Sequence, residues 1–283
     1  MNQKKNKIIG AVVVLAVIFS IYLGYQAYVC VESDDAQISG HVAMLSSRVG
    51  GTIQSVAVEE NQKVKAGQVL AQIDTSDYSN SADAAKAQVA SLQARYTEAQ
   101  VNFERAKNLI EKQAISRERF DEVQAKFKEN GAKLKAAEAQ ASQANLNVTY
   151  TKIIAPTDGT IARKSVENGQ FVPAGQPLFG FVETNERWVT ANLKETELGN
   201  VKIGQKVDVE VDAVSGRKFE GVVESISPGT GAIFSLLPPD NATGNFTKVV
   251  QRVPVRIKLA GITEKDSDLL QTGLSAIVKI HVR

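Results

Sequence analysis

One stretch of twenty residues occurs twice in this chain of 283 residues, with a long insertion between the copies. The copies cover 51–70 and 159–178 and align without a gap at an offset of 108, with eleven of the twenty positions identical. Each copy alternates short β-branched runs with glycine turns, which predicts three or four short strands. Neither copy is large enough to bury a core alone. The duplication therefore predicts two half-motifs that pack against each other.

The insertion between the copies has the apolar pattern of a helical hairpin. Small and apolar residues recur at alternating steps of three and four over 82–110, and the same alternation returns over 120–148. This spacing is typical of a coiled-coil seam, and the polar break at 113–116 separates two helices. We therefore expect an antiparallel coiled-coil hairpin over 76–150 that extends about 50 Å.

Folding one predicted helix back on the other gives specific pairs across the seam. Phe103 then lies opposite Phe127, and Tyr96 lies opposite Leu134. Asn130 occupies a seam position, where a polar residue fixes the register of the two helices or permits a bend.

The N-terminus predicts a membrane anchor. Residues 1–7 carry three lysines and no acid, and residues 8–29 contain no charged residue. This length spans a hydrocarbon core of about 30 Å, and tyrosines gather at its far end, as suits a membrane interface. Lysines before the span and acids after it predict a cytoplasmic tail, 1–7, and a single-pass anchor, 8–30.

From residue 184 onward the pattern changes to longer alternating strands. The predicted strands are Arg187–Leu193, Lys206–Val211, Gly221–Ile226, Val249–Leu259 and Ala276–Val282. Together they predict a small β-barrel over 184–283. The segment 31–46, which follows the anchor, is expected to supply a further strand to this barrel.

A long loop between the third and fourth of these strands carries an apolar group. Its members include Phe234, Leu236 and Leu237. Such a group either packs onto its own barrel or forms a contact with a partner protein.

Composition and motifs argue against an enzyme. The net charge of +2 gives no indication of nucleic-acid binding, and a single cysteine, Cys30, excludes an internal disulfide framework. The two histidines, His41 and His281, are far apart in the sequence and belong to no ligand-spaced cluster. There is no nucleophile elbow, metal spacing or nucleotide loop, so we expect no catalytic residue, metal or cofactor.

The repeated pattern resembles the half-motif of lipoyl and biotinyl carrier domains. In those carriers a modified lysine lies on the hairpin that joins the two halves. Here the junction, 74–78, contains no lysine, and the nearest one, Lys86, falls inside the predicted helix. We therefore expect a split lipoyl-like domain, 47–75 and 151–183, that carries no cofactor.

The order of these parts resembles the membrane fusion, or periplasmic adaptor, family of Gram-negative bacteria. The resemblance sharpens toward the Emr-type branch of the HlyD-like adaptors in Gly229–Gly231, Phe234–Pro238, Asn241–Asn245 and Lys248–Ile257. It implies an α+β fold: a transmembrane helix, a split lipoyl-like domain interrupted by a coiled-coil hairpin, and a C-terminal β-barrel. The hairpin is shorter than in many Emr-type adaptors.

The same resemblance implies a function and a location. Members of this family link an inner-membrane major-facilitator drug:proton antiporter to a TolC-like outer-membrane channel, and they assemble as rings or tubes. We therefore expect a subunit of a tripartite multidrug efflux system, anchored in the bacterial inner membrane with most of the chain in the periplasm.

The family's channel-contacting tip has the motif Arg-x3-Leu-x6-Ser. Arg105, Leu109 and Ser116 have this spacing at the helical reversal, so the resemblance implies that they contact the channel. Each residue also has a structural explanation. Arg105 can be a solvated charge, Leu109 can widen the seam, and Ser116 can cap the second helix, with Glu118 in its first turn.

Three other functions fit parts of the pattern. An adaptor of a type I, ATP-driven protein secretion system shares the architecture but typically has a longer arm and a longer cytoplasmic segment. A biotin or lipoate carrier is disfavoured by the missing lysine. A purely structural coiled-coil scaffold leaves the duplication unexplained.

Overall fold

The computed structural model describes residues 30–214, 216–231, 233, 249–263, 266 and 269–282. The chain divides into two compact units: Ala43–Phe181 forms one, and the segments on either side of it form the other. We call them the sandwich unit and the barrel unit. The predicted span over 8–29 lies outside the described residues, and Cys30, its last predicted residue, instead begins a strand. From residue 30 onward, no described helix is both long and apolar enough to cross a bilayer.

The two half-motifs form equivalent strands in the sandwich unit. The first half provides the end of β1 (Cys30–Ser46), β2 (Gly51–Val56), β3 (Lys63–Val64) and β4 (Val69–Ile73). The second half provides β5 (Lys152–Ile154), β6 (Gly159–Lys164), β7 (Phe171–Val172) and the start of β8 (Pro177–Lys194). β2 and β6, like β3 and β7, begin and end at positions 108 residues apart. The duplication in the sequence is thus a duplication of structure.

Each half contributes one short strand that pairs with a strand of the other half. β7 pairs with β2, and β3 pairs with β6, both antiparallel. The amide of Asn61 donates to the carbonyl of Ile161 at 2.7 Å, and the equivalent amide, Gly169, donates to Ile53 at 2.8 Å. Because each sheet is completed by the opposite half, the two copies must fold together across the helical insertion.

A comparison of the two halves identifies one position at which an apolar core residue is replaced by a polar one. Val49 is buried in the core of the sandwich unit, and the equivalent position in the second half is Thr157. The hydroxyl of Thr157 is buried and has no hydrogen-bond partner among the described residues. A buried hydroxyl without a partner destabilises the folded state because it loses its hydrogen bonds to water.

We expect Thr157→Val to raise the free energy of unfolding of the sandwich unit by about 1 kcal/mol. Thr151→Val is the matched control, since the buried Thr151 hydroxyl donates to Val148 at 2.6 Å and accepts from Gln72 at 3.1 Å. Urea unfolding of both variants should therefore move the midpoint in opposite directions. A lower urea midpoint for Thr157→Val than for the wild type would show that the Thr157 hydroxyl makes a hydrogen bond in solution.

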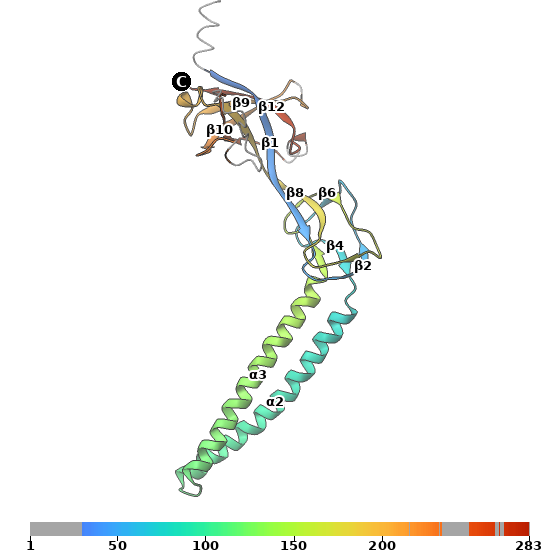
Figure 1. The fold of residues 1–283 in the computed structure, drawn as a ribbon, viewed down its shortest axis with the longest axis vertical. Coiled ribbons are helices and arrows are strands. Elements are labelled where there is room, and N and C mark those ends of the chain that lie inside the picture. Colours follow the sequence, from blue (N-terminus) through green and yellow to red (C-terminus); the bar gives the residue numbers. More distant parts are fainter. Residues whose placement is uncertain are drawn as a thin grey trace, which may run out of the picture. The chain divides into compact units, whose positions relative to one another are not determined.

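Two helices lie between the half-motifs. Figure 1 shows α2 (Ser76–Glu111) and α3 (Arg117–Tyr150) side by side, joined by a short turn. The two helices, 36 and 34 residues long, confirm the expected helical hairpin over 76–150. None of the predicted seam residues in either helix is exposed. The seam pattern therefore identifies the faces that the two helices bury against each other.

Aromatic rings and a glycine define the packing of the distal half of the hairpin. The rings of Phe103 and Phe127 stack with centroids 5.1 Å apart, which confirms the predicted pair, and Tyr96 stacks on Phe127 at 5.2 Å. The ring of Phe120 is tilted against that of Phe103, with the two centroids 5.8 Å apart. A Cβ on Gly131 would lie 3.2 Å from the ring of Tyr96, so the glycine makes room for this ring.

The barrel unit contains six described strands in one closed order. In addition to β1 and β8 these are β9 (Lys206–Val211), β10 (Lys218–Ile226), β11 (Arg252–Leu259) and β12 (Ser275–His281). The order is β1-β12-β9-β10-β11-β8, and β1 also pairs with β8. The hydroxyls of Ser39 and Thr190 meet at 2.9 Å across this closing pair. β1 as far as Val42 thus belongs to the barrel unit, and residues 43–46 at its end belong to the sandwich unit.

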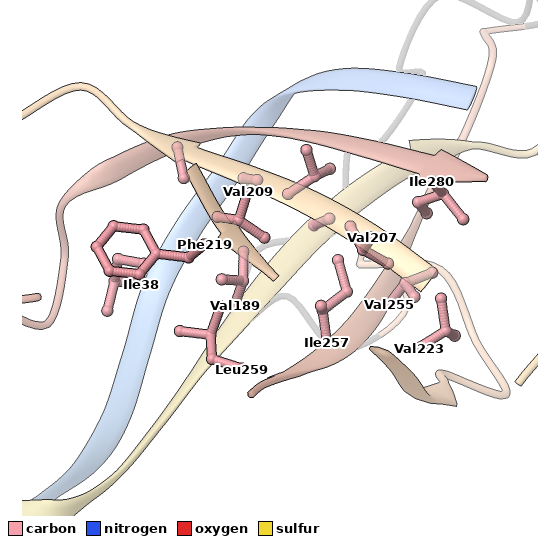
Figure 2. Close-up of a cluster of buried hydrophobic side chains, with 14 of the residues drawn as sticks. Ile38, Val189, Val207, Val209, Phe219, Val223, Val255, Ile257, Leu259 and Ile280 are labelled. Atoms are coloured by element: carbon pink, nitrogen blue, oxygen red, sulfur yellow. The ribbon is translucent and has the colours of Figure 1, made fainter. Parts of the chain in front are cut away.

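The barrel core is built almost entirely from branched aliphatic side chains. Figure 2 shows residues such as Val189, Val209, Ile257 and Ile280 pointing into one cluster, and all four are fully buried. Their strands alternate buried and exposed residues, as expected for a sheet with one solvated face.

β11 begins at Arg252, three residues later than predicted. β11 starts at Arg252 because the neighbouring strand β8 ends at Lys194, the residue that pairs with Arg252. Val249 and Val250 therefore have no part of β8 to pair with, and both are exposed.

Candidate functional site

The hairpin turn closes α2 with a well-defined backbone motif. Gln113 adopts a left-handed conformation with φ 58°. Its amide donates to the carbonyl of Ile110 at 3.0 Å, and the amide of Ala114 donates to that of Leu109 at 2.9 Å. This pair of bonds is the Schellman motif. It holds the backbone of Leu109 by contacts that do not involve the Leu109 side chain.

Ser116 caps α3, as its structural interpretation predicted. Its hydroxyl accepts a hydrogen bond from the amide of Arg119 at 3.2 Å, and its backbone is extended, with φ −74° and ψ 156°. Glu118 lies in the first turn, where a negative charge favours the helix dipole. The Ser116 side chain is exposed, so the cap and a contact with a partner are compatible.

Arg105 and Leu109 lie together on one surface of the hairpin. Both are exposed, Leu109 to 38%, and both line a groove of about 630 Å³ between α2 and α3. Small and apolar side chains contribute to the same groove: Ala99, Ala106, Ile115 and Val123. The structure therefore brings two of the three predicted tip residues into one concave surface, which we call the distal groove, while Ser116 lies outside its lining.

Charged side chains surround this apolar floor. Five are basic and three are acidic: Arg95, Arg105, Arg119, Lys126 and Lys133, and Glu98, Glu122 and Glu129. Glu122 forms an ion pair with Arg119, and Glu129 forms one with Lys133. The hydrogen bond from Lys133 lowers the pKa of Glu129. An apolar floor with a net basic rim suits an acidic, amphipathic helical surface rather than a small reactive substrate.

The basic residues of the distal groove follow a sequence signal that the tip motif alone does not include. Arg119, Lys126 and Lys133 are seven residues apart, as are Glu122 and Glu129. Residues seven apart occupy the same position of successive heptads and so share one side of the helix. Heptad positions beside the seam could thus have located this groove in advance.

The second predicted contact group cannot be placed. Phe234, Leu236 and Leu237 lie outside the described residues. Lys86, the lysine nearest to the half-motif junction, lies within α2 and pairs with Asp83 at 3.1 Å.

Both histidines, isolated in the sequence, have close partners in the barrel unit. His41 lies 3.1 Å from a carboxylate oxygen of Glu186, and its ring meets the edge of Trp188 at 5.0 Å. His281 lies between Cys30 and Asp208. Strand pairing thus gives each histidine neighbours from distant parts of the chain, although no group of His, Cys, Asp and Glu among the described residues is placed to hold a metal ion.

Comparisons with protein-family models match the chain from residue 41 to residue 233 almost without a gap. The model described as "RND MFP, barrel-sandwich hybrid domain" matches residues 41–184. The model described as "CusB-like, beta-barrel domain" matches residues 187–233. The junction between the two matches falls close to the division between the sandwich and barrel units.

Individual relatives agree with these matches. The chain is 35% identical to the multidrug export protein EmrA of Haemophilus influenzae, over 89% of this chain and 76% of that protein. It is 30% identical to the colistin resistance protein EmrA of Acinetobacter baumannii, over 94% and 89% of the two chains. Among solved structures, the membrane fusion protein Spr0693 of Streptococcus pneumoniae R6 aligns with a TM-score of 0.64 at 18% identity, covering 89% of this chain and 98% of that one. At this identity the structural match supports the fold alone.

Proposed function

The chain belongs to the membrane fusion protein family as a periplasmic adaptor of a multidrug efflux system, and we propose that it joins an inner-membrane major-facilitator drug:proton antiporter to a TolC-like outer-membrane channel. Adaptors of this family are transport components without enzymatic activity. They are anchored to a membrane and have a periplasmic bulk.

The observation that carries the proposal is the distal groove. It covers the distal half of the hairpin, and its far end at Leu109 and Ile115 lies roughly 50 Å along the helices from the sandwich at 1.5 Å per residue. Leu109 and Arg105 are exposed there. An exposed leucine in a concave, charge-rimmed surface has the character of a contact residue in a protein interface.

The rest of the proposal concerns the parts near the membrane and the assembly. We propose that residues 8–29 form a single-pass anchor with the tail 1–7 in the cytoplasm. The barrel unit would contact the transporter, helped by the loop that carries Phe234, Leu236 and Leu237. Several copies would assemble as a ring or tube around the path of the drug, with no cofactor.

The transporter is tested by purifying the full-length chain from membranes under mild detergent. We expect a major-facilitator transporter to co-purify and to be identified by mass spectrometry. A variant that lacks residues 1–29 should lose the transporter if the anchor contributes to the contact. Recovery of an ATP-driven exporter in place of a major-facilitator protein would contradict the proposed partner and favour the secretion adaptor.

A further inference from the structure

Three strands of the barrel unit place a thiol, an imidazole and a carboxylate in one row. Cys30 in β1 pairs directly with His281 in β12. On the other side of β12, Asp208 in β9 pairs with Lys279, which is two residues from His281 and on the same face. The intervening residues Val31 and Ile280 are buried in the core. The row of Cys30, His281 and Asp208 therefore lies on the outer face of the barrel.

The imidazole connects the other two groups through its two nitrogens. His281 Nδ1 lies 3.6 Å from the sulfur of Cys30, and its Nε2 lies 2.9 Å from a carboxylate oxygen of Asp208. A carboxylate only accepts hydrogen bonds, so this contact places the ring hydrogen on Nε2 and turns the lone pair of Nδ1 toward the thiol. The sulfur and the carboxylate are on opposite sides of the ring, which is the wrong arrangement for ligands of one metal ion.

This order of groups is the one that activates a sulfur nucleophile. A histidine beside the thiol can take its proton, and a carboxylate on the far side of the ring orients the ring and stabilises the imidazolium that forms. The side chains of His281 and Asp208 are each 39% exposed, and Cys30 is partly exposed. A small molecule in solution can therefore reach the sulfur from the side that the described residues leave open.

Acidic and basic side chains lie beside this row on the same face of the barrel. Glu32 lies 3.2 Å from Lys279, and Lys218 of the neighbouring β10 lies 2.7 Å from Glu210. Lys206, on β9, is exposed on the same face. Two further exposed acids lie on this face: Asp34 on β1, and Glu220, which pairs with Asp208. A thiolate at Cys30 thus faces more acids than bases, and His281 is the group in contact with it.

We propose that Cys30 is a thiol-modification site at which His281 and Asp208 promote thiol–disulfide exchange with a low-molecular-weight disulfide. The thiol proton of Cys30 moves to His281 Nδ1 while the sulfur attacks one sulfur of the disulfide. A new S–S bond forms, and the second sulfur leaves as a thiolate, which takes the proton from the imidazolium. The Cys30 sulfur is oxidised and the leaving sulfur is reduced, so no other oxidant is needed.

The site is independent of the proposed transporter and channel. It requires only that this face of the barrel meets disulfides, and the periplasm, where adaptors have their bulk, is an oxidising compartment. Since Cys30 is the only cysteine of the chain, every disulfide reaction of the protein reports on this one sulfur.

The experiment measures the rate at which the purified full-length protein reacts with 5,5′-dithiobis(2-nitrobenzoate), an aromatic disulfide whose released thiolate absorbs visible light. We expect His281→Gln to react about tenfold more slowly than the wild type at pH 7, the effect of losing a positioned general base. The rate of Asp208→Asn should lie between the rates of the wild type and His281→Gln. In this variant the imidazole remains, but its orientation and charge compensation are weakened. Oxidised glutathione should give a mixed disulfide at Cys30, seen by peptide mass spectrometry.

The matched control is His41→Gln, which removes the other histidine of the barrel and should leave the rate unchanged. Equal rates for the wild type and His281→Gln would overturn the proposal. If His281→Gln does not fold, a wild-type rate in Asp208→Asn, or a wild-type protein no faster than free glutathione thiol, would overturn it equally.

Discussion

Replacing Leu109 by aspartate is expected to reduce drug resistance to the level of cells that lack the adaptor. Leu109 is 38% exposed in the distal groove, so an aspartate at this position remains in contact with water in the free hairpin. Closing a partner surface over it would bury a carboxylate in place of an apolar side chain, which weakens an interface by about 2 kcal/mol or more. The measurement is the minimal inhibitory concentration of an exported drug in cells with the transporter and channel.

Leu146→Asp is the matched control for this variant. Leu146 is also an exposed leucine of the hairpin, at 42%, but it lies near the base of α3. It should leave resistance unchanged, and immunoblots should show equal amounts of both variants. Intact resistance in Leu109→Asp, together with unchanged crosslinking from the tip to the channel, would show that Arg105, Leu109 and Ser116 are not the channel contact.

Replacing Phe179 by alanine is expected to destabilise the sandwich unit by about 3–5 kcal/mol. Phe179 is fully buried in the core to which both half-motifs contribute, and truncation leaves a cavity that the two interlocked sheets cannot close. The loss is a large part of the stability of a typical domain, about 5–15 kcal/mol. Hydrogen exchange should show it as lost protection of the Asn61 and Gly169 amides, which connect the two halves.

Two comparisons make this result specific. Phe171→Ala removes the same ring from an exposed site, 68% accessible, in the same unit, and should change stability by less than about 0.5 kcal/mol. The single tryptophan, Trp188, lies in the barrel unit, so its fluorescence transition in urea should be the same in Phe179→Ala and the wild type. Equal protection of the two amides in Phe179→Ala and the wild type would mean that the core tolerates the cavity.

Local patterns in the sequence were sufficient to predict the two helices and the equivalence of the two half-motifs. The alternating steps of three and four predicted the buried face of both helices, because helix periodicity alone decides which side chains share a side. The Ser116 cap was predictable for the same reason, since a cap depends on neighbours within one turn. The offset of 108 predicted two equivalent half-motifs, because identical sequences of strand and turn residues fold alike.

Contacts between distant segments were decided only by the tertiary structure. The sequence did not show that β3 and β7 cross to the sheet of the opposite half, because each short strand satisfies the same pattern in either sheet. The tip motif included Arg105 and Leu109 but missed the basic residues of α3 that share their groove. The proximity of Cys30, His281 and Asp208 depends on the register of β1, β12 and β9.

The hairpin and the duplication were thus determined by the sequence itself, through periodicity and internal identity, which act within short stretches of chain. The distal groove and the thiol cluster were determined by the pairing of helices and strands that are far apart in the chain. The buried face of a helix can be predicted from the sequence of that one segment. To predict a surface shared by two segments, the angle and register at which they meet must also be known. For this reason the adaptor architecture was predictable from residue order, and the chemistry at Cys30 was not.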